Sequence, residues 1–403
     1  MILTLDQARD VIRRNLETAA CVPSPENLPL EQALGRVLAA NACADRDYPP
    51  FPRSARDGYA VRSSDCAAAP VTLRCQGEVR AGGFFAAALH PQECVRIMTG
   101  APVPAGADSV VMVEQTEAKG EDVTFLRSAA ALDNIVPQGA EARKGAVVLT
   151  RGRRIDPGAM GLLASIGAAE VKVFKKPEVA ILPTGDELVS AEIPPEWFQI
   201  RNSNSYSLSA QVSLAGGKPR PLAIAPDEAG ALRTLLLDGL KSDLLLVSGG
   251  VSAGKYDLVE SILSDLGAEF FFDGVSIRPG KPAVFGRVRD KFFFGLPGNP
   301  ISTYVTFELL ARPAISALTG AGFEPQYAYG ARLTGPVKPR EDLTVFIPAH
   351  AAQSEGSPVV APVAWQGSGD MAGFAAANCF IVLRPGHEIR NAGDWVEIMP
   401  KRF

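Results

Sequence analysis

The chain has 403 residues, of which 47% are hydrophobic and 21% are charged, and its formal net charge is -4. This length predicts two to four domains at roughly 150 residues per domain, and the composition is typical of a soluble globular protein rather than a disordered or fibrous one. The slightly acidic balance gives no general electrostatic reason to bind nucleic acid or an anionic membrane, so any anion site has to be local.

Cysteine usage and the N-terminus both favour a cytoplasmic protein. The six cysteines include no C-x-x-C pair, which predicts reduced, buried thiols rather than a disulfide framework or a zinc site. The first seventeen residues carry several charges and lack the apolar stretch of a signal peptide. No window approaches the ~18 consecutive apolar residues of a membrane span.

The first 45 residues predict two helices. Thr4 and Gln7 form a capping-box pattern, and apolar residues at helical spacing follow it to about residue 19. A second helix is predicted over residues 30–40, after Pro29. The run of Pro and Gly over residues 49–59 excludes helix and central strand, so we expect a loop and a domain boundary there.

Residues 46–144 contain short apolar runs separated by Gly and Pro turns, which predict a small inserted β domain. Asp156 and Pro157 then read as the N-cap and first position of a helix that ends at Gly167. Because helical character returns there, we expect residues 1–45 and 145–173 to form one discontinuous domain around the insertion.

Residues 174–325 alternate apolar strands with helices. The strands are EVAILP, DLLLVS and FFFGLP, and helices are expected near 203–215, 228–241, 257–267 and 300–318. This pattern predicts a doubly wound α/β domain whose parallel sheet is covered on both faces. Residues 326–403 return to short β runs, which predict a compact C-terminal barrel or sandwich.

Four polar, Gly-rich segments follow the strands of the α/β domain, over residues 183–188, 248–257, 277–282 and 295–300. In an open parallel sheet the loops at the carboxyl ends of the strands share one edge, where ligands bind. In the second segment Gly249, Gly250 and Gly254 allow close approach of backbone N–H groups to an anion, although a tight turn without a ligand is the alternative.

Charged residues in these loops extend the hypothesis to metal-bridged phosphate chemistry. Arg278 and Lys281 could clamp an oxyanion, or else form a solvated surface pair. Glu187 and Asp257 would repel a phosphate unless a cation such as Mg²⁺ lies between them. Asn299 could cap the last helix, which Pro300 would begin as its first residue. Alternatively, the N-terminus of this helix, beside Gly298, could be open to an anion.

The motifs SARDGYAV, MTGAPVP, TGDEL, SGGVSAG, RPGKP and GLPGNP occur in this order, and with them the whole chain resembles the MoeA-type molybdopterin molybdenumtransferases, which are related to the gephyrin E domain. The resemblance implies four domains per chain, the last a β barrel, in an elongated homodimer. It also implies a transferase of molybdenum cofactor biosynthesis, which cleaves adenylylated molybdopterin in the presence of molybdate and Mg²⁺ and releases AMP. A molybdopterin adenylyltransferase would hand over the substrate.

Residue roles follow from the same resemblance. Asp57 and Thr99 are expected to reach the α/β domain of the partner subunit. The implied catalytic residues are Asp57, Thr99, Glu187, Asp227, Asp257, Arg278, Lys281 and Ser368. The implied cofactor-binding residues are Gly249, Gly250, Ser252, Gly254, Pro297, Gly298 and Asn299. The implied metal ligands are Asp57, Glu141, Glu187, Asp227 and Asp257. For Asp227 an ordinary helix N-cap is the alternative interpretation.

The chain departs from the family pattern at Arg56, where Met is usual, at Glu141, where Asp is usual, and at Gly274, where some members have Lys; Arg278 also replaces a Lys. These departures put the oxyanion contacts in question. Two other functions stay open: a molybdopterin adenylyltransferase, which shares the GGVS-type loop but needs neither SARDGYAV nor the C-terminal domain, and a non-catalytic scaffold like the gephyrin E domain.

Overall fold

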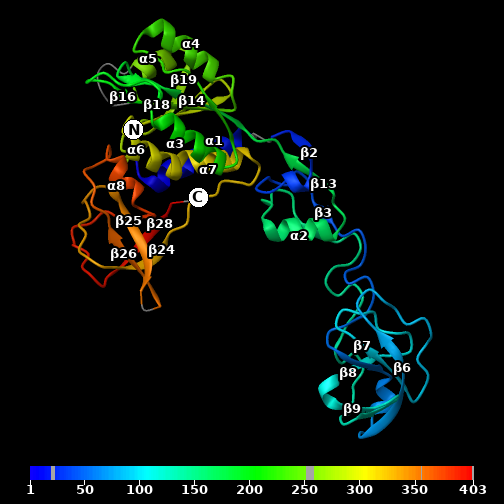
Figure 1. Cartoon of the computed structure of the whole chain (residues 1–403). Helices are drawn as coiled ribbons and strands as arrows, with labels where there is room; N and C mark the ends of the chain where they lie inside the picture. Colours follow the sequence, from blue (N-terminus) through cyan, green and yellow to red (C-terminus); the bar gives the residue numbers. More distant parts are fainter. Residues whose placement is uncertain (20–22, 251–257, 355, 402–403) are drawn as a thin grey trace.

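The computed structural model describes residues 1–19, 23–250, 258–354 and 356–401. Figure 1 shows an α/β body, C-terminal strands packed beside it, and an arm that carries a separate β-sheet at its far end. We use four names for these parts: the α/β body (residues 178–318 with helix α1), the arm (25–49 and 140–174), the inserted β unit (53–136) and the C-terminal barrel (329–400).

The α/β body is built on a six-stranded sheet with the order β17-β14-β18-β23-β22-β19. Its strands are β14 (Glu178–Pro183), β17 (Lys218–Pro221), β18 (Leu244–Ser248), β19 (Ala268–Phe272), β22 (Val284–Val288) and β23 (Lys291–Leu296). The first four strands of that order are parallel, as predicted. At the far edge, β22 runs antiparallel to both of its neighbours, β23 and β19. The tight hairpin at Arg289 and Asp290 forces this reversal, because two residues cannot make a parallel crossover.

Helices cover both faces of this sheet, which confirms the predicted doubly wound fold. They are α3 (Asn204–Leu214), α4 (Ala229–Gly239), α5 (Leu258–Asp265), α6 (Pro300–Thr306) and α7 (Arg312–Leu318), with a π-helical turn (Phe307–Ala311) joining the last two. Alternate residues of β14 enter different cores: Val179 and Ile181 pack with α3 and α7, whereas Ala180 and Leu182 pack with α4 and α5. Burial on both faces explains why these strands are continuously apolar.

The N-terminal helix α1 (Leu5–Thr18) has the predicted capping box at Thr4 and Gln7. Its apolar face lies in the same hydrophobic core as α7, and strand β1 (Ile2–Leu3) pairs with β20 (Gly274–Val275). The helix therefore packs on the α/β body and not on residues 145–173. The proposed domain boundaries themselves stay a prediction.

The arm is held together by two strand pairs. Strand β2 (Pro25–Pro29) pairs with β13 (Glu170–Phe174), and β3 (Ala42–Cys43) pairs with β12 (Val147–Leu149). Helix α2 (Pro157–Ser165) begins after the predicted N-cap, Asp156, whose side chain accepts a hydrogen bond from the Ala159 N–H at 2.7 Å.

The helix predicted over residues 30–40 is wrong. Only a single 3-10 turn (Leu30–Gln32) forms there, and the chain then reverses at Gly35, which has a φ of 74°. Beyond Gly35 the backbone bonds across to the returning chain, with the Leu38 N–H donating to the Arg153 carbonyl at 3.0 Å. Long-range pairing outweighs the local helical pattern.

The inserted β unit is a six-stranded sheet with the order β8-β5-β7-β6-β10-β9. Its strands are β5 (Gly58–Val61), β6 (Val71–Val79), β7 (Glu93–Ile97), β8 (Ser109–Met112), β9 (Thr116–Lys119) and β10 (Asp122–Phe125), with 3-10 turns at Ser63–Cys66 and Val113–Gln115. The chain enters and leaves this unit through two adjacent strands, β4 (Arg53–Ser54) and β11 (Ile135–Val136), which pair with each other.

The C-terminal barrel closes because β25 pairs with both β26 and β27, while β24 and β28 complete the circle. The strands are β24 (Tyr329–Leu333), β25 (Thr344–Ser354), β26 (Ser357–Pro362), β27 (Cys379–Leu383) and β28 (Trp395–Pro400), with helix α8 (Met371–Ala375) between β26 and β27. Strand β21 (Ile277–Arg278) of the body adds to β25. Of the open alternatives, barrel or sandwich, the structure has the barrel.

No helix in the described part of the chain is both long and apolar enough to cross a membrane.

A buried ion pair lies where α6 passes through the π-helical turn into α7. The side chains of Glu308 and Arg312 are only 2% and 5% exposed. Arg312 donates from Nη2 to Glu308 Oε1 at 2.9 Å, and Gln211 of α3 donates to the same oxygen at 2.7 Å. The pair therefore joins α3 to the α6–α7 helix inside the body.

Replacing Glu308 with alanine leaves a buried guanidinium without its carboxylate, so we expect a loss of about 3–5 kcal/mol in the free energy of unfolding. Urea unfolding followed by circular dichroism measures it. The control is Asp10→Ala, which breaks the solvent-exposed Asp10–Arg13 pair in α1 and should cost below about 1 kcal/mol. Equal losses in the two variants would contradict this account of the buried pair.

Candidate functional site

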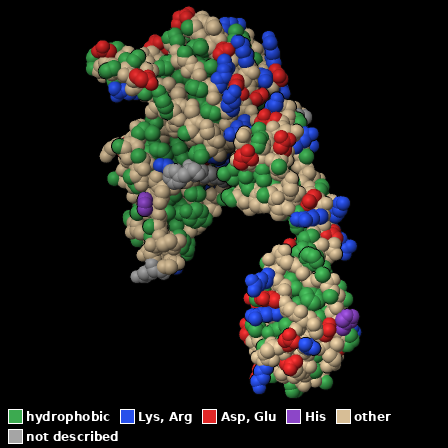
Figure 2. All heavy atoms as spheres, turned by 45° about the vertical axis from the view of Figure 1, so that its right-hand side comes forward, with side chains coloured by type: hydrophobic (Ala, Val, Ile, Leu, Met, Phe, Trp, Pro, Cys, Tyr) green, Lys and Arg blue, Asp and Glu red, His purple; other side chains and the backbone are tan. Residues whose placement is uncertain are grey.

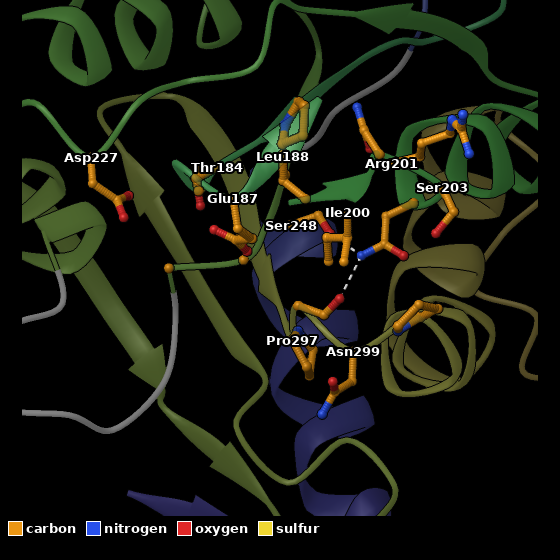
Figure 3. Close-up of a pocket in the computed structure, with 18 of the residues that line it drawn as sticks. Thr184, Glu187, Leu188, Ile200, Arg201, Ser203, Asp227, Ser248, Pro297 and Asn299 are labelled. Carbon is orange, nitrogen blue, oxygen red and sulfur yellow. Dashed lines mark hydrogen bonds between the residues drawn. The ribbon is translucent and has the colours of Figure 1, made fainter. Parts of the chain in front are cut away.

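A cavity of about 440 Å³ lies at the carboxyl ends of β14, β18 and β23 (Figure 3), and we call it the sheet-edge cavity. This is the edge at which the sequence predicts ligand binding. Its described lining residues are Pro183, Thr184, Gly185, Glu187, Leu188, Ile200, Arg201, Asn202, Ser203, Asn204, Asp227, Ser248, Gly249, Gly250, Pro282, Pro297, Gly298, Asn299 and Pro300.

The predicted loops contribute unequally. The segments over 183–188 and 295–300 and the start of 248–257 all line the cavity, whereas the segment over 277–282 contributes only Pro282. Arg278 and Lys281 are exposed and are absent from the described lining, because Arg278 belongs to β21, which runs beside the C-terminal barrel. Their role in holding an oxyanion stays a prediction.

Two carboxylates, Glu187 and Asp227, line one side of the cavity (Figure 3). The loop that carries Asp227 is held against the end of β14, because the Asp186 side chain accepts a hydrogen bond from the Asp227 N–H at 2.9 Å. The N-cap of α4 is Glu228, whose pKa is lowered by hydrogen bonds from the backbone N–H groups of Ala231 and Gly230. The alternative interpretation of Asp227 as the helix cap is therefore wrong.

Thr184, which the sequence did not single out, lies buried at the floor of the cavity with only 3% of its surface exposed. Within the described residues its hydroxyl Oγ1 has no hydrogen-bond partner. A buried hydroxyl without a partner costs roughly 1–3 kcal/mol. A polar group of a bound ligand would remove that cost, so this hydroxyl points to a ligand site.

Gly249 and Gly250 pass directly over Thr184. Their φ angles are 96° and 62°, in the left-handed region that favours glycine. A Cβ on Gly249 would lie 2.6 Å from the Thr184 carbonyl, and one on Gly250 would lie 2.8 Å from Thr184 Oγ1. Both conformation and space therefore require glycine here. The other predicted residues of this loop, Ser252, Gly254 and Asp257, lie outside the described residues.

Asn204 at the start of α3 fixes the opposite wall. Its side-chain amide donates to Ser248 Oγ at 2.9 Å and to the Gly298 carbonyl at 2.8 Å, so it ties the ends of two strands to one helix. Arg201 and Ser203 lie on this side, across from the carboxylates (Figure 3), and Arg201 is the one basic side chain in the described lining. Asn204 and Arg201 were not predicted from the sequence. Arg201 lies on a two-residue strand, β16 (Ile200–Arg201), and Asn204 follows it; β16 pairs with β15 (Leu188–Val189) and has no apolar pattern.

Asn299 occupies the N-cap position of α6, yet its side chain makes no capping hydrogen bond. The Ile301 N–H instead donates to the carbonyl of Ser368, at 3.0 Å, which brings the C-terminal segment to this helix end. The sequence leaves two roles open for Asn299, capping of the helix or binding of an anion at its N-terminus. The exposed amide at the cavity now favours a ligand contact.

Asp57 and Thr99 lie together in the inserted β unit. Thr99 donates its N–H at 2.6 Å and its hydroxyl at 2.7 Å to Asp57 Oδ1. These two bonds, the backbone one foremost, lower the pKa of Asp57, so its carboxylate is charged at neutral pH. Figure 1 shows the sheet of this unit at the far end of the arm from β14 and β18, so one chain does not bring Asp57 to its own sheet-edge cavity.

The remaining sequence candidates lie apart from the cavity. Glu141 is exposed and forms an ion pair with Arg53 at 2.9 Å in the arm, and Arg56 is exposed beside Asp57. Gly274 is buried on β20, where it pairs with Ile2. Over residues 1–19, 23–250, 258–354 and 356–401, no three His, Cys, Asp or Glu side chains are placed so that they could hold a metal ion.

Comparison with known proteins identifies the family. Three family models match in chain order: the MoeA N-terminal region (domain I and II) over residues 3–167, a probable molybdopterin binding domain over 180–317, and the MoeA C-terminal region (domain IV) over 330–401. The sheet-edge cavity lies within the second of these.

Relatives that match along nearly the whole chain indicate the same family. A molybdopterin molybdenumtransferase of Bacillus subtilis is 37% identical over 383 residues, which cover 93% of this chain and 89% of that protein. One from Haemophilus influenzae is 35% identical and covers 99% of this chain and 98% of that protein.

Solved structures match over the same length. The molybdopterin biosynthesis MoeA protein of Pyrococcus horikoshii OT3 has a TM-score of 0.80 at 25% identity, and another Pyrococcus MoeA structure has a TM-score of 0.76 at 30% identity; both cover 100% of both chains. With these relatives and all three family models in order, the chain belongs to the MoeA-type molybdopterin molybdenumtransferase family.

Proposed function

We propose that this protein inserts molybdenum into molybdopterin during molybdenum cofactor biosynthesis, cleaving adenylylated molybdopterin, with molybdate and Mg²⁺, to give Mo-molybdopterin and AMP. The relatives' shared name, molybdopterin molybdenumtransferase, supports a transferase of this kind. The observation that carries the proposal is the buried Thr184 hydroxyl, which has no hydrogen-bond partner among the described residues and lies in a cavity within the region that matches a probable molybdopterin binding domain.

The cavity suits a ligand that carries phosphate. The glycine turn at Gly249 and Gly250 exposes backbone to the cavity, and the Thr184 hydroxyl beneath it can donate a hydrogen bond to a phosphate oxygen. The first residues of α3 also face the cavity, where the positive end of a helix dipole favours an anion. Arg201 adds a full positive charge on the same side.

Glu187 and Asp227 fit a Mg²⁺ ion that is shared with substrate. In proteins Mg²⁺ is usually held by one or two carboxylates together with substrate phosphates and water, so two acids on one wall suffice. When bound, the ion would neutralise charge on the phosphate oxygens as the bond to AMP breaks. The two carboxylates would hold it beside the glycine turn.

The site is complete only in a homodimer under this proposal. Asp57 and Thr99 lie at the far end of the arm, so they can serve a sheet-edge cavity only from the partner subunit. The charged Asp57 carboxylate, oriented by Thr99, would then orient the metal or a reacting water in the partner's cavity. We place the reaction in the cytoplasm, downstream of a molybdopterin adenylyltransferase.

A turnover assay tests the reaction itself. With adenylylated molybdopterin as substrate, AMP release should require both molybdate and Mg²⁺, because cleavage is coupled to metal insertion. AMP and molybdenum-bound product are quantified by chromatography and mass spectrometry. Pyrophosphate release from ATP and molybdopterin would instead identify an adenylyltransferase, and no turnover with either substrate would favour a scaffold.

The variant Thr184→Val tests the cavity floor. Valine keeps the shape but removes the hydroxyl, so kcat/KM for AMP release should fall about tenfold, which corresponds to one hydrogen bond of ~1.4 kcal/mol. The melting temperature should not fall, since the hydroxyl has no hydrogen-bond partner among the residues that the structure describes.

A matched control is Ser109→Ala, which removes another buried hydroxyl without a partner within the described residues, on β8 of the inserted β unit. It should leave kcat/KM nearly unchanged. Equal kcat/KM for Thr184→Val and the unaltered protein would remove Thr184 from the site.

Mixing two inactive variants tests the composite site. Asp57→Asn and Glu187→Gln should each abolish AMP release, yet refolding them together should restore about a quarter of the activity. Half of the random dimers are mixed, and each of those has one intact site. If both residues acted within one chain, the mixture would stay inactive, and that result would sink the composite site.

A further inference from the structure

A second cavity, of about 590 Å³, lies where the arm joins the α/β body, at the amino ends of β14, β18 and β23 and thus at the opposite edge of the sheet from the first. We call it the junction cavity. Its described lining residues are Ala19, Pro23, Ser24, Lys175, Lys176, Pro177, Asp243, Arg287, Arg289, Asp290, Lys291 and Leu318. Nothing in the proposed reaction uses it.

Positive charge dominates this lining, with five basic side chains against two carboxylates. Arg287 is paired with Glu269 at 2.7 Å. In the part of the chain that the structure describes, the other four, Lys175, Lys176, Arg289 and Lys291, form no ion pair. Among the described residues neither carboxylate forms an ion pair with any of these four cations: Asp243 accepts a hydrogen bond from the Glu178 N–H at 2.8 Å, and Asp290 lies exposed in the hairpin turn. The charge of the lining therefore stays positive, five cations against two carboxylates.

Other basic residues on the same sheet edge do form ion pairs. Lys218 and Arg220 of β17 lie within 3.5 Å and 3.9 Å of Glu178, and Lys241 lies 3.0 Å from Asp238. Figure 2 shows Lys and Arg side chains gathered on this face of the body, above the arm, with acidic residues among them. Unpaired cations are therefore a feature of the junction cavity and not of the whole edge.

Four unpaired cations around one concave space repel one another, and the surrounding protein focuses their field into the cavity. A multivalent oxyanion would relieve that repulsion, with arginine binding it through two N–H groups and lysine as a point charge. The volume suits a small ligand rather than a protein segment. The described lining contains no aromatic ring on which a nucleobase could stack, which favours a small phosphate compound without a base.

The cations come from two parts of the chain that meet here. Lys175 and Lys176 belong to the segment that returns from the arm, and the Lys175 N–H donates to the carbonyl of Ser24 in the outgoing segment at 2.9 Å. Arg289 and Lys291 belong to the β22–β23 hairpin of the body. An anion in the cavity would therefore contact both the arm's connection and the body.

We propose that the junction cavity is a second anion site, which binds a small multivalent oxyanion of the pyrophosphate class and bridges the arm's connecting segment to the α/β body. The site is separate from the sheet-edge cavity, so its occupancy does not depend on the proposed reaction. Its ligand fixes the root of the arm that carries Asp57.

Isothermal titration of the full-length protein with inorganic pyrophosphate tests the site. Lys175→Gln combined with Lys176→Gln should weaken one binding event at least tenfold, and Arg289→Gln combined with Lys291→Gln should weaken the same event similarly, because the ligand bridges both groups. The control, Lys218→Gln with Lys241→Gln, removes the same charge from paired positions on this edge and should change the affinity less than twofold. Melting temperatures confirm that each variant is folded.

Four results would overturn the proposal. Equal weakening by the control pair would mean general attraction to a basic surface, and a loss from only one of the two cation groups would exclude a bridge. Inorganic phosphate binding as tightly as pyrophosphate would mean an adventitious ion only. An acidic peptide that binds more tightly than pyrophosphate, and does so through Lys175 and Lys176, would assign the cavity to a protein partner instead.

Discussion

The structure depends on the burial of β18 between β14 and β23. Because helices cover both faces of this sheet, every residue of β18 is buried, and the backbone hydrogen bonds of the strand are all taken by its neighbours. Strands held in this way end in register, so their following loops meet at one edge. The sheet-edge cavity, its glycine turn and its two carboxylates all follow from that constraint.

The same sheet separates two electrostatic environments. At the carboxyl edge, acids and a single arginine face one another across a small space, as expected where a cation and a phosphate group are to be bound together. At the amino edge, three lysines and one arginine without an ion pair among the described residues line the junction cavity, beside only two carboxylates. An overall charge of -4 gives no indication of either environment, because each depends on which loops the fold brings together.

The sequence predicted the α/β body well, because its strands are continuous apolar runs that alternate with helical segments and Gly-rich loops. It also located the cavity, since Glu187, Gly249, Gly250 and Asn299 follow parallel strands, whose carboxyl ends share one edge. Thr184 could have been found by the same argument, since it directly follows β14. Arg201 and Asn204 could not, because the first lies on, and the second follows, a strand of two residues that is defined only by its partner strand.

Other predictions failed where distant pairing decided the conformation. Residues 30–40 have a helical pattern, but their backbone groups bond to residues more than 100 positions away. Arg278 was also expected beside the glycine loops, whereas it lies on β21 next to the C-terminal barrel and outside the described cavity lining; its role in holding an oxyanion stays a prediction. Neither pairing leaves a local signal in the sequence.

The paired strands at the root of the inserted β unit set its distance from the arm. Because β4 and β11 run side by side, the chain leaves the arm and returns to it at almost one point, and the unit between them is positioned as a whole. A strand residue adds about 3.3 Å of length. Adding one residue to each strand would therefore shift Asp57 by about that length, and it would also turn the side chains of the lengthened strands to the opposite face. Under the proposed composite site, the length of this two-strand root sets how far the Asp57 carboxylate reaches from the arm.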